Sequence, residues 1–202
     1  MNIGAEKETD FGYYFRWGEQ QGWIVTGDGY VSLNETNCVQ AGTGNKWNDQ
    51  SWKLRDSRVK NTDVPDICGK INQGPVNGII YGDVATYNWG GRWRMIDGTL
   101  LNKLQGNMGS LTIGSVTLKI SYDTEKGVVA ISNEELGTSV KFPISSYIAS
   151  GARWDTSVYS WTTAVSTQSI LDFLALKVNA QSIGINAFNS YYDLTVRPVA
   201  EF

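Results

Sequence analysis

Short runs of alternating apolar and polar residues recur along the chain, and this period of two restricts the fold more than any other feature of the sequence. The longest run, residues 115–123, places apolar side chains on one side of an extended strand and polar ones on the other. Similar alternation marks residues 11–17, 140–144, 159–165 and 192–197. Because 22 glycines and only 4 prolines separate these runs, we expect an all-β sandwich or barrel.

Two glycine turns indicate hairpins. Residues 22–26 and 30–33 flank a Gly-Asp-Gly turn, and residues 86–89 and 92–95 flank Gly90-Gly91. A two-residue glycine loop can adopt the positive φ angles of the tight hairpin turns. We therefore expect each pair of segments to form an antiparallel hairpin. For Trp89 and Trp93, the alternative to a role in binding is a structural clamp across the second hairpin.

The rest of the chain shows no internal repeat and no linker long enough to divide it, so residues 1–202 are expected to form one domain. Residues 98–110 are rich in glycine and asparagine and indicate a loop. Residues 184–190 are typical of a loop or a strand edge. Residues 170–178 fit either a short buried helix or a central strand, and the pattern alone does not separate the two.

Cys38 and Cys68 are the only cysteines and stand thirty positions apart. A disulfide between them would close a long loop and stabilise the fold by about 3–4 kcal/mol. We expect this bond, which is typical of exported proteins. The alternative is two unpaired, buried cysteines in a cytosolic protein. A zinc site is not expected, since the chain has no histidine to complete the usual four ligands.

Composition narrows the range of functions. The formal charge of −3 argues against non-specific binding to nucleic acid or to anionic membranes. No apolar run approaches the roughly 18–20 residues of a membrane-spanning helix. With no histidine, Ser-His and Cys-His mechanisms are excluded. We expect a protein that is not an enzyme and needs no metal or cofactor. The enzymatic alternative is a glycosidase with a carboxylate pair, such as Glu134-Glu135 or Asp123-Glu125.

Surplus tryptophan and asparagine favour recognition instead. Sugars stack their C–H faces on aromatic rings, while short polar side chains bind the hydroxyl groups. Two stretches combine these residue types beside turn-forming glycines, and a third, Arg153-Trp154-Asp155, is kept in reserve. For each tryptophan the competing interpretation is packing in the core. The first group consists of Trp47, Asn48, Asp49 and Trp52, and the second of Asn88, Trp89, Arg92 and Trp93.

The whole chain resembles the N-terminal receptor-binding domain of two-domain chaperone–usher fimbrial tip adhesins. The resemblance is carried by its size, its β pattern, its aromatic and asparagine content and the segment Tyr192–Val199, whose Val-Arg-Pro-Val is similar to a late strand of the GlcNAc-binding fimbrial lectins. It implies an elongated immunoglobulin-like or jelly-roll β-sandwich, with room for one short helix. It also implies export through the periplasm to the fimbrial tip, and a pilin domain after Phe202 that joins other fimbrial subunits.

Three functions follow as alternatives. The first is a monomeric adhesin domain that binds a host glycan or glycoprotein and mediates bacterial attachment. The second is a carbohydrate-active enzyme with an Asp/Glu pair. The third is a structural or phage-type β module whose aromatic residues only form a core.

Overall fold

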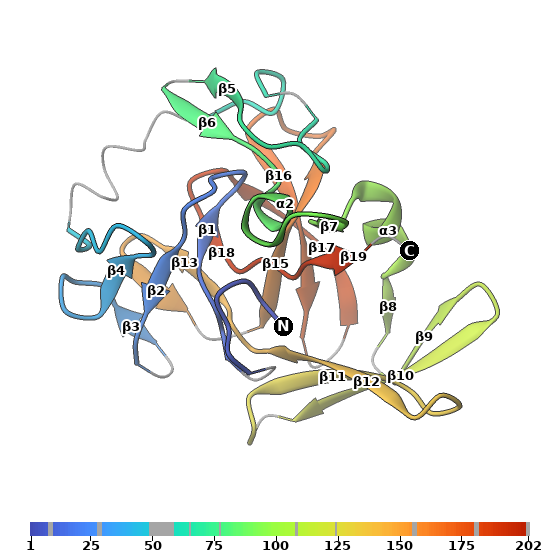
Figure 1. Cartoon of the computed structure of the whole chain (residues 1–202). Coiled ribbons are helices and arrows are strands. Elements are labelled where there is room, and N and C mark those ends of the chain that lie inside the picture. The colour runs from blue at the N-terminus through green and yellow to red at the C-terminus, as the bar shows by residue number, and fades with distance from the viewer. Residues whose placement is uncertain are drawn as a thin grey trace.

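The protein is described by a computed structural model that covers residues 1–7, 10–27, 30–48, 59–64, 66–76, 78–107, 109–123, 125–154, 157–179 and 182–200. Several antiparallel sheets dominate these residues, which also form the short helices α2 and α3 (Figure 1). The expectation of a mostly β fold is confirmed at this level. Neither helix of the described segments has the length and apolar character needed to cross a membrane.

The largest sheet has five strands in the order β1-β18-β13-β14-β3. On one face of this sheet the side chains are buried. They are Arg16, Asp193, Ile148 and Arg153. The opposite face carries Phe15 and other large side chains. The strands are β1 (Phe15–Arg16), β18 (Asp193–Leu194), β13 (Tyr147–Ala149), β14 (Ala152–Trp154) and β3 (Val31–Ser32).

A second sheet contains the longest strands, in the order β15-β16-β17-β8. Its strand β15 is buried on both faces over Val158–Thr163, so the alternation over residues 159–165 does not separate a core face from a solvent face. The ambiguous segment 170–178 is a strand and not a helix, because it pairs along its length with both neighbours. The bounds are β15 (Val158–Val165), β16 (Asp172–Val178), β17 (Ser182–Asn189) and β8 (Gly106–Asn107).

The third sheet is a four-stranded meander in the order β12-β11-β10-β9. The alternation holds in the middle of the strand, where Ile120 is buried while Lys119 and Ser121 are exposed. At its start Val116 is 43% exposed and does not face the core. Register places Ile120 opposite Ile131, so one face of the sheet is apolar. The strands are β9 (Ser110–Ile113), β10 (Val116–Asp123), β11 (Val128–Asn133) and β12 (Thr138–Pro143).

Both predicted hairpins are wrong. The strand at 23–25 pairs with β4 and the strand at 31–32 pairs with β14, so the two flanks of the first turn join different sheets. The second turn follows a helix, as described below. Three two-stranded pairs complete the β structure: β2 (Trp23–Val25) with β4 (Cys38–Gln40), β5 (Gln73–Val76) with β6 (Ile79–Tyr81), and β7 (Trp93–Arg94) with β19 (Val199–Ala200).

Two helices replace segments that were expected to be strand and loop. Helix α2 (Val84–Trp89) occupies the first half of the predicted tryptophan hairpin, and α3 (Gly98–Lys103) occupies the predicted loop 98–110. Each begins after an aspartate, Asp83 or Asp97, whose side chain accepts backbone N–H groups of the first turn. The caps therefore specify where both helices begin.

The main core lies between the first two sheets, and two indoles hold it together. The Trp17 Nε1–H donates to the carbonyl of Thr162 at 2.8 Å, and the Trp161 Nε1–H donates to the carbonyl of Phe15 at 2.7 Å. Trp17 also packs on Phe173, with ring centroids 4.0 Å apart. The two tryptophans thus satisfy their polar groups while filling the core, and they join β15 to the β1 segment in both directions.

The predicted disulfide is wrong: Cys38 and Cys68 are both free thiols. Cys38 is buried on β4 in a small cluster with Trp23 and Trp47. Cys68 lies in the turn that precedes β5, beside Arg94. A disulfide requires Cα atoms within about 7 Å and converging Cβ vectors. The fold places the two cysteines in separate packing environments, so sequence separation alone was a poor guide to pairing.

Both thiols are expected to be titratable in denaturant, and reduction should leave the intact mass unchanged. In the native protein Cys38 should resist alkylation because burial, together with the negative charge of Asp193, raises its pKa. Burial also raises the pKa of Cys68, so its alkylation should be slow at neutral pH and should accelerate only above the pH at which an ordinary thiol ionises. A mass gain of two hydrogens on reduction would show that Cys38 and Cys68 are bonded after all.

Candidate functional site

A buried carboxylate, Asp83, holds together the segments that carry the exposed residues Trp89 and Trp93. Asp83 is fully buried, and its Oδ1 accepts the backbone N–H groups of Ala85 and Thr86, each at 3.0 Å. Its Oδ2 accepts the N–H of Gly69 at 2.9 Å, and both oxygens accept that of Met95 at 3.0 and 3.1 Å. One side chain thus joins the start of α2, the end of β7 and the loop that carries Cys68.

Two glycines then close α2 onto β7. Gly90 and Gly91 both have positive φ, as the sequence predicts, and the Gly90 N–H donates to the carbonyl of Thr86 at 2.8 Å. The N–H of Trp93 returns to the carbonyl of Gly90 at 3.1 Å, and the hydroxyl of Thr86 donates to the carbonyl of Trp93 at 2.9 Å. The chain therefore reverses direction directly after α2, and Trp89, the last residue of the helix, faces β7.

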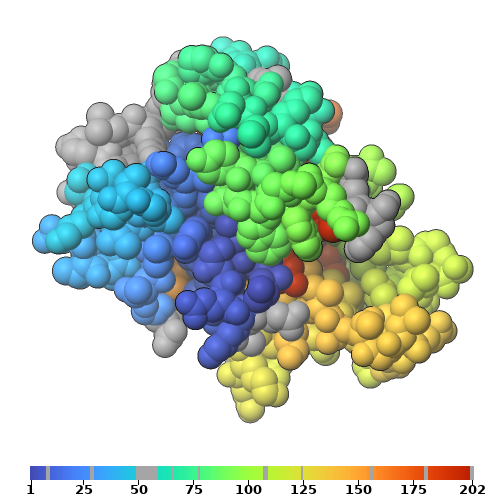
Figure 2. Space-filling view, viewed as in Figure 1, coloured from blue at the N-terminus to red at the C-terminus, as the bar shows by residue number. Residues whose placement is uncertain are grey.

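This reversal brings Trp89 and Trp93 together at the surface. Their ring centroids are 5.0 Å apart and their planes meet at 87°, so the rings form an aromatic corner. Trp89 is 36% exposed and Trp93 is 37% exposed, with Tyr87 also exposed beside them. Figure 2 shows the segment that carries them, in green, on the surface of the molecule. The two rings pair, as the structural-clamp alternative states, but the pair joins a helix to a strand instead of spanning a hairpin.

The polar members of this group have different surroundings. Asn88 is exposed, and its amide donates to the carbonyl of Val84 at 2.9 Å, which closes one turn of α2. Arg92 is exposed in the turn between the two tryptophans. Of the second sequence-predicted group, Trp89 and Trp93 are in contact, while Asn88 and Arg92 are exposed and next to them in the chain.

The first predicted group is divided. Trp47 is only 3% exposed and packs edge-to-face on Trp23, with centroids 5.0 Å apart, so its ring belongs to the core and does not lie at the surface. Asn48 is exposed. Asp49 and Trp52 lie outside the described residues. In the reserve group, Arg153 is buried and Trp154 is exposed, while Asp155 lies outside the described residues.

The carboxylate pairs considered for hydrolysis lie on the meander sheet. Asp123 accepts from the Lys126 ammonium at 2.8 Å, and Glu134 forms an ion pair with Lys119 at 2.9 Å. The Lys126 contact lowers the pKa of Asp123, which is the opposite of what a general acid needs. Glu125 and Glu135 are exposed.

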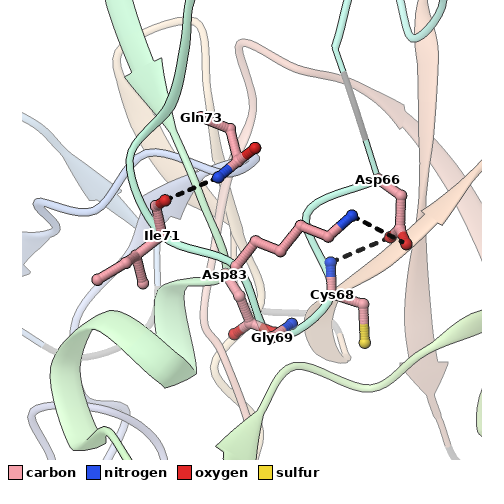
Figure 3. Close-up of polar contacts among 7 residues, drawn as sticks. Asp66, Cys68, Gly69, Ile71, Gln73 and Asp83 are labelled. Carbon is pink, nitrogen blue, oxygen red and sulfur yellow. Dashed lines mark hydrogen bonds and ion pairs between the residues drawn. The ribbon is translucent and has the colours of Figure 1, made fainter.

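Cys68 and Asp66 line a pocket of about 440 Å³ beside the start of α3. The Asp66 carboxylate accepts the Cys68 N–H at 3.0 Å and lies 3.8 Å from the Lys70 ammonium, and the Cys68 sulfur points away from it (Figure 3). Asp97, also at the pocket, accepts the Leu100 N–H at 2.7 Å as the cap of α3. Since the Cys68 pKa is raised, this thiol is not activated as a nucleophile. Within the described residues, no group of three histidine, cysteine or acidic side chains is placed to hold a metal ion.

Comparison of the chain with protein-family models, curated proteins and solved structures found no match.

Sequence reasoning missed Asp83, on which the exposed corner depends. A local signal was present, because an aspartate directly before a helix-compatible stretch is a preferred N-cap. Nothing in the local sequence indicates that the same carboxylate also binds Gly69 and Met95, since those contacts come from segments 14 and 12 positions away.

Proposed function

We propose that this chain is a receptor-binding module of the fimbrial-adhesin type, which attaches bacteria to saccharides on the host surface through the corner formed by Trp89 and Trp93. The observation that carries the proposal is a pair of exposed indoles held in a fixed mutual orientation by hydrogen bonds. Large exposed aromatic rings on a rigid scaffold are typical of recognition sites. Their flat apolar faces suit the C–H faces of sugar rings.

Preorganisation supports this function. Trp89 ends a helix that is capped by the buried Asp83, and Trp93 lies on a strand paired with β19. A site whose side chains are already ordered loses little conformational entropy when it binds. Asn88 and Arg92, which precede Trp89 and Trp93 in the chain, are exposed polar residues of the kind that binds saccharide hydroxyl groups.

The wider adhesin assignment is part of the same proposal. The first core cluster contains Phe15 and Leu194 from the five-stranded sheet and Trp161 and Phe173 from the β15–β17 sheet. Contact between these two sheets is compatible with an immunoglobulin-like or jelly-roll sandwich. The proposal includes export to the fimbrial tip and attachment of a pilin domain. It does not need a disulfide, since the indole hydrogen bonds and the cores stabilise the sheets directly.

A single corner of this kind should bind weakly, with a dissociation constant of about millimolar to micromolar. Many copies displayed on one cell convert weak single contacts into strong attachment. Binding should need neither metal nor cofactor.

Trp89→Ala and Trp93→Ala are each expected to reduce binding to the strongest glycan-array ligand by about tenfold or more, which corresponds to about 1.4 kcal/mol. The reason is the loss of one of the two stacking faces. Binding is measured on a glycan array and then by titration with the array ligand. Trp89→Phe should retain part of the affinity because it keeps a ring.

Leu136→Ala serves as the matched control. Leu136 is 73% exposed on the meander sheet, so its substitution removes apolar surface far from α2 in the sequence. All variants must first show the wild-type unfolding midpoint. Full binding by both tryptophan variants would exclude this corner as the receptor site. If the wild type binds no glycan and no host glycoprotein, the structural β module becomes the better assignment.

A further inference from the structure

The turn between β3 and β4 carries a motif that the corner of Trp89 and Trp93 does not use. Asn34-Glu35-Thr36 fits the pattern Asn-x-Ser/Thr, in which the asparagine accepts an N-linked sugar. No other asparagine of the sequence is followed two positions later by serine or threonine. Because a triplet of this kind also occurs by chance, its surroundings decide what it can do.

The structure presents this motif to solvent. Asn34, Glu35 and Thr36 are all exposed, and they follow β3, an outer strand of the five-stranded sheet (Figure 1). The chain is anchored on both sides of them: the Leu33 N–H donates to the carbonyl of Gly151 at 2.8 Å, and Cys38 is buried at the start of β4. The motif therefore lies on a short, fixed surface turn, as an acceptor site requires.

Thr36 is bonded directly to the acceptor side chain. The Oδ1 of Asn34 accepts the Thr36 N–H at 2.9 Å and the Thr36 hydroxyl at 2.5 Å. Hydrogen bonds to this oxygen polarise the amide and draw electron density from its nitrogen, so the Nδ2 protons become easier to lose. Among the described residues the Nδ2 of Asn34 has no hydrogen-bond partner, so it is open to a reacting sugar.

Asn37, in the same turn, shows the opposite arrangement. Its Oδ1 accepts the Asn34 N–H at 2.9 Å, and its Nδ2 donates to the carbonyl of Ser32 at 2.8 Å. Both ends of this amide are used to hold the turn, and Asn37 has no serine or threonine two positions later. The two asparagines therefore differ in role: Asn37 fixes the turn, and Asn34 presents an amide nitrogen on it.

We infer that Asn34 is a modification site, which accepts an N-linked sugar from a glycosyl diphosphate donor. In the transfer, Nδ2 attacks C1 of the donor sugar, and a C1–Nδ2 bond forms as the bond from C1 to the diphosphate oxygen breaks. The diphosphate leaves with the bonding electrons, and one Nδ2 proton passes to a base of the transferase. A glycan on this turn would stand beside the outer strand β3 and hinder its pairing with another chain.

Two donors test the inference on the whole chain. The folded protein is incubated with a soluble N-glycosyltransferase and UDP-glucose. Separately, the chain is secreted behind a leader from a eukaryotic host, whose transferase uses a lipid-linked oligosaccharide. One glycan per chain is expected, and peptide mass spectrometry should place it on Asn34. Thr36→Val keeps the shape but removes the hydroxyl group and should abolish the addition, whereas Thr36→Ser should retain it.

The two arms also identify the donor. Addition with UDP-glucose alone supports the inference with a nucleotide sugar, and addition in the secretory host alone supports it with a lipid-linked sugar. A wild-type chain that gains no sugar in either arm overturns the inference, whether or not the variants fold. Sugar on another asparagine, or equal addition to Thr36→Val, also overturns it. Asn34→Gln should lose the glycan and keep its glycan-array binding, because the turn is separate from α2 and β7 (Figure 1).

Discussion

Replacing Trp161 with alanine is expected to lower the free energy of unfolding by about 3–5 kcal/mol. The indole is completely buried in the core between the two main sheets and packs edge-to-face on Phe188, with centroids 6.0 Å apart. Truncation removes this packing and leaves the buried carbonyl of Phe15 without the indole donor that reaches it at 2.7 Å. The change is measured by equilibrium unfolding in urea, extrapolated linearly to water.

Two further variants separate the contribution of packing from that of the hydrogen bond to the stability lost in Trp161→Ala. Trp161→Phe keeps most of the apolar volume but removes the donor, so it should cost about 1–3 kcal/mol. Trp93→Ala removes an indole that is more than a third exposed and should cost clearly less than Trp161→Ala. A Trp161→Ala protein whose stability stays within 1 kcal/mol of the wild type would contradict the assignment of this residue to the core.

Asp83→Ala is expected to destabilise the protein by about 3–5 kcal/mol. Its carboxylate accepts four backbone N–H groups, from Gly69, Ala85, Thr86 and Met95, in a fully buried position. Removing it leaves donors that water does not readily reach, and each such buried group costs about 1–3 kcal/mol. Urea unfolding measures the free energy of unfolding. Faster hydrogen exchange of the Met95 amide would report the loss of its hydrogen bond to Asp83.

Asp97→Ala is the matched control, because Asp97 also caps a six-residue helix but accepts only the Leu100 N–H from the contacts described. Loss of an ordinary cap costs about 1 kcal/mol. The destabilisation by Asp83→Asn should fall between those of Asp83→Ala and Asp97→Ala, because one carboxylate oxygen becomes an NH₂ group that faces N–H donors. Equal destabilisation by Asp83→Ala and Asp97→Ala would show that Asp83 acts as a helix cap alone.

The Asp83 network also explains why the exposed tryptophan corner depends on buried residues. The carboxylate holds the start of α2 and the end of β7, and these two elements carry Trp89 and Trp93. A variant at Asp83 would therefore change both stability and binding. Substitutions at the two tryptophans themselves are the cleaner test of function.

Local patterns in the sequence were sufficient for some elements. The alternation over 115–123 identified β10 and the face that Ile120 buries, because one side of this meander strand packs on a core while the other meets water. The glycine pair at 90–91 was correctly read as a turn with positive φ, a requirement that two successive glycines meet without steric cost.

Other elements depended on contacts that no local pattern records. Strand β15 has the same alternation as β10, yet Ser160 and Thr162 are as buried as Trp161, because both of its faces are covered. Residues 84–89 form a helix where a strand was expected, since a buried aspartate binds their first N–H groups and also Met95. The two cysteines stay apart because Cys38 is buried with Trp23 and Trp47, whereas Cys68 lies half-buried beside Arg94.

The sequence by itself determined the β character of the chain, its glycine turns and which residue types are available for recognition. The tertiary structure alone decided which tryptophans are core and which are surface. Trp47 is buried against Trp23, whereas Trp89, Trp93 and Trp154 remain exposed. The physical reason is that the exposure of a large aromatic ring depends on which distant segments cover it, and those segments are chosen by strand pairing and core packing over the whole chain.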